Sequence, residues 1–113
     1  MEEREFLELA DTELAKIEDA LDRLQERIDA DWDYELKPGG IIELDLEAGG
    51  KIIINRHTAA REIWIAARSG GFHFKPPSAH GQPWTDTRTG KDLAIVLSHC
   101  ISDQTGGNVA VTW

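Results

Sequence analysis

The sequence contains little of the chemistry that most catalytic and metal sites require. Cys100 is the only cysteine among 113 residues, which excludes an internal disulfide and any site built from several thiolates. The four histidines show no H-x-x-x-H spacing, and we find no glycine-rich phosphate loop and no nucleophile beside a recognisable base. No catalytic centre is therefore predicted.

Long apolar runs and a basic leader are also missing. No run approaches the roughly 18 apolar residues of a membrane-spanning helix, and the chain begins with "MEEREFLELADTELA", which is acidic where a signal or transit peptide would be basic. We therefore expect a cytoplasmic protein that does not enter a membrane. At this length, with 41% hydrophobic residues, we expect residues 1–113 to form a single domain.

Basic side chains are scarce in the first half of the chain. Residues 1–50 hold 17 acidic and 5 basic side chains, a balance of −12, whereas residues 51–113 hold 4 acidic and 7 basic, a balance of +3. Because phosphates would be repelled by the first half, we expect no nucleic-acid ligand and favour a cation or a basic protein surface. A solubilising charge coat is an equal alternative for the acidity taken alone.

The spacing of apolar residues predicts a long amphipathic helix. Between residues 4 and 28 they recur in alternating steps of four and three, at Ala10, Leu14, Ile17, Leu21, Leu24 and Ile28. One flank of this stripe is acidic, with Asp11, Glu18, Asp22 and Asp29, and the other is basic, with Lys16, Arg23 and Arg27. Glu18 and Asp22 repel each other at i,i+4, which costs roughly 0.2–0.5 kcal/mol. The segregation indicates that the acidic flank does more than solubilise.

The acidity continues beyond the helix in "DADWDYELK". Its carboxylates alternate with apolar and aromatic residues, so a strand through its later part would present them on one face. We call the acidic helix flank together with this segment the acidic ridge. Carboxylates without histidine or cysteine are hard oxygen donors suited to Fe²⁺, Fe³⁺, Mn²⁺, Ca²⁺ or Mg²⁺. Metal binding there should be weak, hydrated and sensitive to salt.

Strand patterns fill the middle of the chain. "GGIIELDLEAGGKIIINRH" predicts two strands joined at Gly49-Gly50. "AREIWIAAR" predicts a third and "FHFK" a fourth, ended by two prolines, and a short "WTD" pairs after them. Alternation sends Ile63 and Ile65 to one face of the sheet and Trp64 to the other.

A second helix is predicted near the end of the chain, in "TGKDLAIVLSHCISDQTGG". Thr89 is its expected N-cap, and Cys100 falls on its apolar stripe, where a buried and inert thiol is expected. The tail "NVAVTW" should lie against the body. The order of elements predicts an α+β fold: a two-layer sandwich of an antiparallel sheet of about five or six strands, with both helices on one face. Trp64 then stands on the uncovered face.

Three stretches of the sequence resemble one known family. "NRHTAAREIWIA" is similar to the signature of the frataxins, in which an Asn and a basic residue precede a turn and a hydrophobic-Trp-hydrophobic strand. "SGGFHF" resembles the following strand of the bacterial frataxin (CyaY) family, and "WTDTRTGKDLAIVL" resembles the family's later Trp, turn and final helix. With the acidic first helix, the resemblance covers nearly the whole chain.

The resemblance implies a function in iron–sulfur cluster assembly. It implies that the protein binds iron, as Fe²⁺, Fe³⁺ or both, weakly on the acidic ridge, and that it docks on a cysteine desulfurase and its scaffold protein to regulate them. The implied metal ligands are Asp11, Glu18, Asp19, Asp22, Asp29, Asp31 and Asp33. The implied partner-binding residues are Glu18 and Asp22 on the ridge and Asn55, Arg56 and Trp64 on the uncovered sheet face.

Three alternatives stay open at this stage. The chain can be an acidic protein-interaction module with no metal role, an iron-storage protein, or a protein that oxidises iron at the ridge. We expect a monomer, with an iron-dependent oligomer as the alternative state. Other divalent cations should be able to replace iron, because exposed carboxylates discriminate poorly among hard cations.

Overall fold

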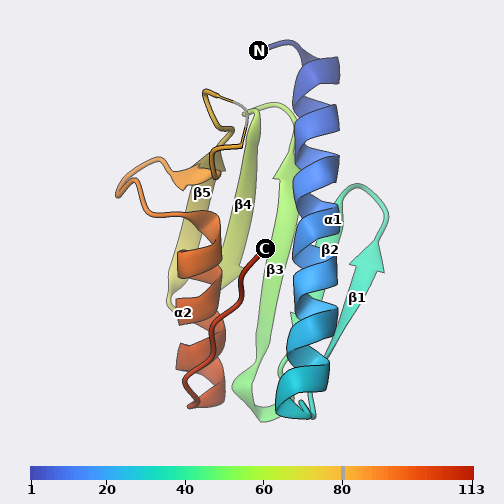
Figure 1. Cartoon of the computed structure of the whole chain (residues 1–113), viewed down its shortest axis with the longest axis vertical. Helices are drawn as coiled ribbons and strands as arrows, with labels where there is room; N and C mark the ends of the chain where they lie inside the picture. The colour runs from blue at the N-terminus through green and yellow to red at the C-terminus, as the bar shows by residue number, and fades with distance from the viewer. Residues whose placement is uncertain (80) are drawn as a thin grey trace.

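The computed structural model describes residues 1–79 and 81–113. Its elements are α1 (Glu3–Ile28), β1 (Asp33–Lys37), β2 (Ile41–Asp45), a 3-10 turn η1 (Glu47–Gly49), β3 (Lys51–His57), β4 (Glu62–Ala67), β5 (Gly70–Lys75), β6 (Thr85–Asp86) and α2 (Leu93–Thr105). The six strands form one sheet in sequence order, and every neighbouring pair is antiparallel. Both helices lie on one face of this sheet (Figure 1). The predicted two-layer α+β sandwich is confirmed.

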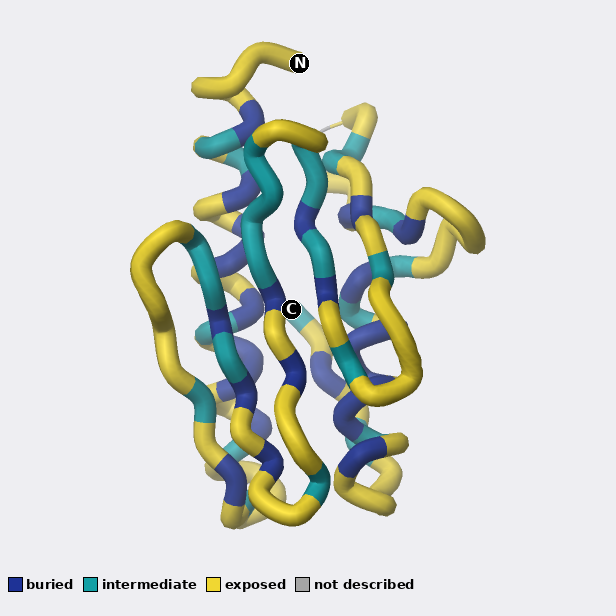
Figure 2. The backbone as a smooth tube through the Cα atoms, turned by 180° about the vertical axis from the view of Figure 1, so that it is seen from behind, coloured by how far each residue is buried: buried dark blue, intermediate teal, exposed yellow. Residues whose placement is uncertain are grey.

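The core fills the layer between the helices and the sheet. Ile52 and Ile54 of β3 and Ile63 and Ile65 of β4 are at most 1% exposed, and they alternate with residues of the opposite face. All the predicted stripe residues of α1 are buried except Ile28, which is 41% exposed at the helix end. Burial of each large apolar side chain stabilises the fold by roughly 1.5–3 kcal/mol. Figure 2 shows the sheet from its uncovered side, with the helices behind it.

The start of α2 differs from the prediction. The helix begins at Leu93 with Asp92 as N-cap residue, so Thr89 is not its N-cap. The Asp86 carboxylate accepts the N–H groups of residues 88 and 89 at 2.7 and 3.2 Å, which folds this segment into a turn after β6. The Leu93 N–H then donates to the Trp84 carbonyl at 3.0 Å. Thr89 therefore belongs to a turn that the Asp86 carboxylate of β6 stabilises. The local sequence pattern did not reveal this contact.

The cysteine is buried, as predicted. Cys100 is 2% exposed on the inner side of α2. Burial raises the pKa of its thiol, although the Ser69 hydroxyl 4.0 Å away acts in the opposite direction. A thiol that stays protonated is a poor nucleophile, which agrees with a packing role.

The C-terminal tail runs between the two helices (Figure 1). The Ser98 hydroxyl accepts the Val111 N–H at 2.9 Å, and the Ser102 hydroxyl accepts the Val109 N–H at 2.8 Å. The Trp113 indole N–H donates to a carboxylate oxygen of the buried Glu13 at 2.7 Å. These contacts confirm that the tail packs on the body.

The tail also occupies the basic flank of α1. Arg23 donates to the carbonyl of Thr112 at 3.3 Å, and Arg27 donates to the carbonyl of Ala110 at 2.8 Å. Two cations of this helix therefore serve the packing of the tail, whereas the acidic flank turns the other way, towards β1. Within the described residues, neither helix is both long and apolar enough to cross a membrane.

Candidate functional site

The acidic flank of α1 meets β1 through Tyr34. The Tyr34 hydroxyl donates to Asp22 Oδ1 at 2.5 Å. Burial raises the pKa of Tyr34 above its ordinary value, and the bond to Asp22 and the charges of Asp22, Glu18 and Asp33 raise it further. Glu18, Asp22 and Asp33 thus act on one phenol, which joins the helix part and the strand part of the acidic ridge.

Tyr34 was not among the predicted site residues. The signal for it was present in the sequence, because Tyr34 alternates with Asp33 and Glu35 and so turns towards the helix layer. Its register partner on β2 is Leu44, a core residue that is fully buried. Alternation therefore predicts that the Tyr34 side chain points towards the helices. Which residue of α1 it contacts depends on how α1 packs on the sheet.

Asp11 is paired with Arg56, and this corrects the expected position of the arginine. Arg56 shares the helix-facing side of β3 with the buried Ile52 and Ile54, and its Nη1 lies 2.5 Å from Asp11 Oδ1. The prediction that Arg56 lies on the uncovered face beside Trp64 is wrong. Its guanidinium passes so close to Gly40 that an added Cβ would lie 2.9–3.0 Å from the Arg56 side chain.

The other predicted metal ligands are spread over the molecule. Asp19 pairs with Arg23 of the basic flank of α1 at 3.1 Å. Asp29 caps α1 in a left-handed conformation, with φ of 49°, and Asp31 follows in the connection to β1. The sequence placed all seven carboxylates on one ridge, but the structure gathers only Glu18, Asp22 and Asp33 around Tyr34.

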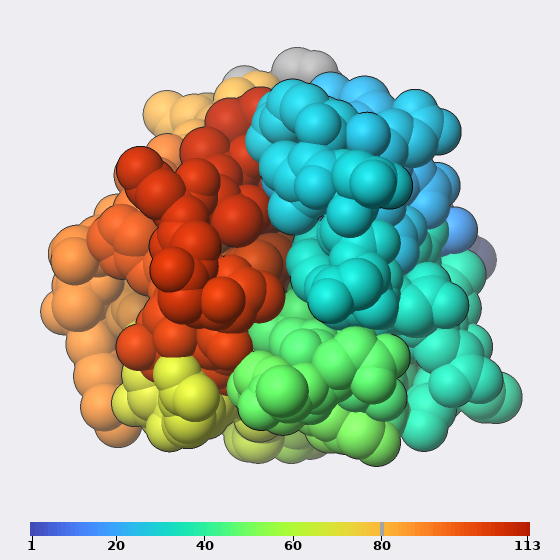
Figure 3. All heavy atoms as spheres, turned by 90° about the horizontal axis from the view of Figure 1, so that it is seen from below, coloured from blue at the N-terminus to red at the C-terminus, as the bar shows by residue number. Residues whose placement is uncertain are grey.

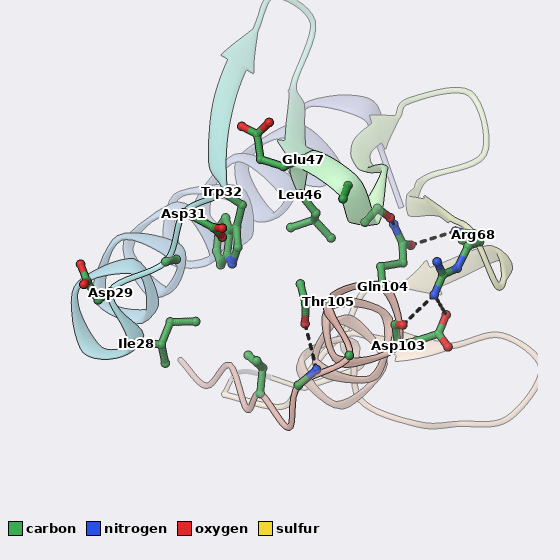
Figure 4. Close-up of a pocket in the computed structure, with 16 residues that line it drawn as sticks. Ile28, Asp29, Asp31, Trp32, Leu46, Glu47, Arg68, Asp103, Gln104 and Thr105 are labelled. Carbon is green, nitrogen blue, oxygen red and sulfur yellow. Dashed lines mark hydrogen bonds and ion pairs between the residues drawn. The ribbon is translucent and has the colours of Figure 1, made fainter.

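Asp29 and Asp31 line a hollow at the base of the molecule. It has a volume of about 640 Å³ and lies where the end of α1, the η1 turn and the end of α2 meet (Figure 3). Trp32 and Leu46 form part of its wall, and Arg68 at its edge bonds to Asp103 (Figure 4). Asp29 and Asp31 are thus not among the carboxylates that act on Tyr34.

No preformed multidentate metal site is visible in the part of the chain that the structure describes. Among residues 1–79 and 81–113, no three His, Cys, Asp or Glu side chains converge closely enough to hold one ion. Carboxylates are suitable ligands for iron, but one ion can reach at most two of them here without rearrangement. The donor set of the described residues therefore does not fit a closed iron centre.

The uncovered face of the sheet carries a line of alternating charges at its β1 side. Glu43 accepts from Lys37 at 2.6 Å and from Lys51 at 2.8 Å. These two ammonium groups lower the pKa of Glu43 to about 2, and Glu43 raises the pKa of Lys51 in return. Glu43 is thus paired with two lysines, whereas no ion pair among the described residues includes Glu18, Asp22 or Asp33.

Trp64 stands on the uncovered face, as predicted, but its ring is not bare. It is stacked between His57 of β3 and His73 of β5, with ring centroids 3.7 and 4.2 Å away and interplanar angles of 13° and 8°. Its indole N–H donates to Glu62 Oε1 at 2.7 Å. Asn55 is its register partner on β3, which confirms that Asn55 shares this face.

Comparisons with known proteins agree on one family. The sequence profile of the frataxin-like domain matches residues 1–107. The iron–sulfur cluster assembly protein CyaY of Dechloromonas aromatica is 47% identical over 106 residues, which cover 94% of this chain and 94% of that protein. The protein of the same name from Ralstonia nicotianae is 41% identical over 109 residues, covering 96% of this chain and 93% of the relative.

Solved structures give the same result. A frataxin from Psychromonas ingrahamii matches with a TM-score of 0.77 and 31% identity, over 100% of both chains. A trimeric frataxin from the yeast Saccharomyces cerevisiae, complexed with ferrous iron, matches with a TM-score of 0.68 and 29% identity, over 94% of this chain and 88% of that one.

Proposed function

Because the chain belongs to the frataxin-like family, we propose that it is an iron–sulfur cluster assembly protein that binds iron weakly and regulates a cysteine desulfurase and its scaffold. One observation carries this proposal beyond the names of the relatives. The acidic flank of α1 faces β1 without basic partners for Glu18, Asp22 and Asp33, since none of the ion pairs among the described residues includes them.

The same three carboxylates support iron binding. They act on one phenol, Tyr34, and so lie near enough to reinforce one another's field. Like charges in one neighbourhood raise the local concentration of cations. The ion would be cargo at the surface, held by one or two carboxylates and by water. The affinity should be low, because each missing protein ligand leaves a water in place.

The ridge also supports docking on a basic protein surface. Glu18 and Asp22 project from the helix face that α2 and the tail leave open, where a partner's lysines and arginines can reach them. Complementary charge accelerates encounter and sets orientation. We assign the second part of the interface to Asn55 and Trp64 on the uncovered sheet face. Arg56 contributes through Asp11, whose position on α1 it holds.

Iron and docking use the same carboxylates, so they are thermodynamically coupled. A bound cation reduces the negative charge that attracts a basic patch, and each ligand changes the affinity for the other by the same factor. This gives iron level a direct effect on the partner's activity.

A desulfurase turnover assay with and without Fe²⁺ tests the proposal. We expect the wild-type protein to change turnover, the change to depend on Fe²⁺, and the double variant E18Q/D22N to lose most of the effect. The control E3Q/E5Q removes the same charge from the exposed first turn of α1, away from Tyr34, and should behave as wild type. Unchanged turnover with wild-type protein at all iron concentrations would exclude the proposed regulation.

A metal-independent interaction module is the second candidate. It is favoured by the lack of three converging ligands among the described residues. Titration with Co²⁺ or Fe²⁺, followed by amide NMR, separates the two. Paramagnetic broadening centred on Glu18, Asp22 and Asp33 supports the iron binder, whereas sharp ridge signals at millimolar metal support the module.

A further inference from the structure

We propose that His57 is a positioning residue for the docking face: together with His73, it holds the Trp64 indole on edge, so that a partner meets the rim of the ring and not its flat side. The inference rests on the proposed docking through Trp64 and names the feature that prepares this residue for it. His57 was not among the residues that the sequence singled out for binding.

The rings come from three neighbouring strands, which fixes the direction of the stack. Trp64 is opposite His73 in the β4–β5 register, and His57 lies diagonally across from it, two residues along β3 from the Trp64 partner Asn55. The centroid distances of 3.7 and 4.2 Å are close to the spacing of adjacent strands, about 4.7–4.9 Å. The stack therefore runs across the strands, and each ring stands with its edge away from the sheet.

Polar contacts hold the rings in place. Glu62 Oε1 accepts the Trp64 indole N–H and lies 3.7 Å from His73 Nδ1, so one carboxylate faces both rings. On the other side, the Ala60 N–H donates to His57 Nδ1 at 3.3 Å. The imidazole of His57 is thus tied to the turn that joins β3 to β4.

This contact also decides which hydrogen His57 presents. Because Nδ1 accepts from Ala60, the neutral ring carries its hydrogen on Nε2, the nitrogen farther from the backbone. The stack of three rings therefore offers an apolar indole rim beside an imidazole N–H donor. A protein partner with an apolar side chain next to a carbonyl or carboxylate oxygen matches this surface.

The expected effect of His57 on affinity follows from stacking. Aromatic pairs contribute an amount that corresponds to about two- to tenfold in an equilibrium constant, beyond the area that they bury. A ring already fixed in the free protein also loses less freedom on binding. Without His57, one face of the indole is open and the ring can turn.

Three variants of the full chain test the inference. We expect H57A to weaken binding to the desulfurase–scaffold complex by about two- to tenfold, with little change in Tm. H57F keeps a ring against the indole and should bind within about twofold of wild type if stacking is the main contribution. H99A removes an exposed histidine on α2, away from the stack, and serves as the matched control.

NMR supplies a readout that does not depend on any partner. In H57A the Trp64 indole N–H signal should shift and broaden and the His73 ring protons should move, whereas H57F should keep values close to wild type. Unchanged Trp64 and His73 signals in H57A overturn the inference, and so does binding of H57A that equals wild type. The proposed docking through Trp64 is wrong if the wild-type protein does not bind the desulfurase–scaffold complex, or if W64A binds it as the wild type does. In that case the NMR result alone decides whether His57 positions the indole.

Discussion

Tyr34 is the only tyrosine in the chain, so its titration can be followed without interference from other phenols. Its pKa is raised by burial and by the ridge carboxylates. A raised pKa in the folded state stabilises the protein fully below the unfolded value of about 10, and this contribution is lost as the pH rises through the folded value. The variant Y34F removes this titration and the hydrogen bond to Asp22.

The effect of Y34F on the free energy of unfolding has two contributions, the lost hydrogen bond to Asp22 and the lost titration of the phenol. At pH 7, Y34F should lower the free energy of unfolding by about 1 kcal/mol, because it loses one hydrogen bond to a charged but solvent-accessible acceptor. Above pH 10 the free energies of unfolding of wild type and Y34F should become more similar, because only the wild type loses stability as Tyr34 ionises. Between the unfolded and the folded pKa the free energy of unfolding of the wild type falls by at most about 1.4 kcal/mol per pH unit. Because solvent screens the partly exposed phenol and so makes the pKa shift smaller, we expect an average of roughly half this slope between pH 10 and 11.5.

Urea denaturation of both proteins between pH 7 and 11.5 measures this difference, and the titration of lysines cancels between them. Absorbance near 295 nm should show Tyr34 titrating well above pH 10 in the wild type and closer to pH 10 in D22N. A stability difference that stays flat or widens up to pH 11.5, or a D22N titration identical to wild type, would refute the proposed link between Tyr34 and the ridge.

Other predictions concern the tail, one glycine and the ridge. W113A should lower the free energy of unfolding by about 2–4 kcal/mol in denaturant unfolding, because it removes an aromatic contact and leaves the buried Glu13 carboxylate without its indole donor. A loss below about 0.5 kcal/mol would show that the tail does not pack as described. G40A should cost more than about 1 kcal/mol, because its Cβ would meet Arg56 at a positive φ of 76°, and G39A, at a φ of 92° with open space around it, should cost less. Equal losses for the two glycine variants would argue against the Arg56 contact. Binding of Co²⁺, measured by calorimetry, should weaken several-fold between about 0.02 and 0.2 M salt, since the ligands are exposed; salt-independent affinity would require a closed site.

The regular elements follow from periodicity in the sequence. The three-and-four spacing of apolar residues in α1 and the alternation of isoleucines in β3 and β4 require one buried face on each element, whatever the neighbours are. The short connections between β1 and β5 then favour pairing of neighbouring strands in sequence order. The face of Trp64 was predictable on these grounds, and so was that of Arg56, since it continues the alternation of Ile52 and Ile54.

Contacts between elements were decided by the tertiary structure. The sequence determined that α1 has an acidic flank, but only the placement of the helix on the sheet brings Asp22 to Tyr34 and Asp11 to Arg56, while Asp29 is left at the base. It determined that Trp64 faces away from the core, but only the register of three strands encloses its ring between His57 and His73. The physical reason is that periodicity fixes the direction of a side chain relative to its own element, whereas the residue that it meets depends on register and on the position of a separate element, which are set by the packing of the whole core.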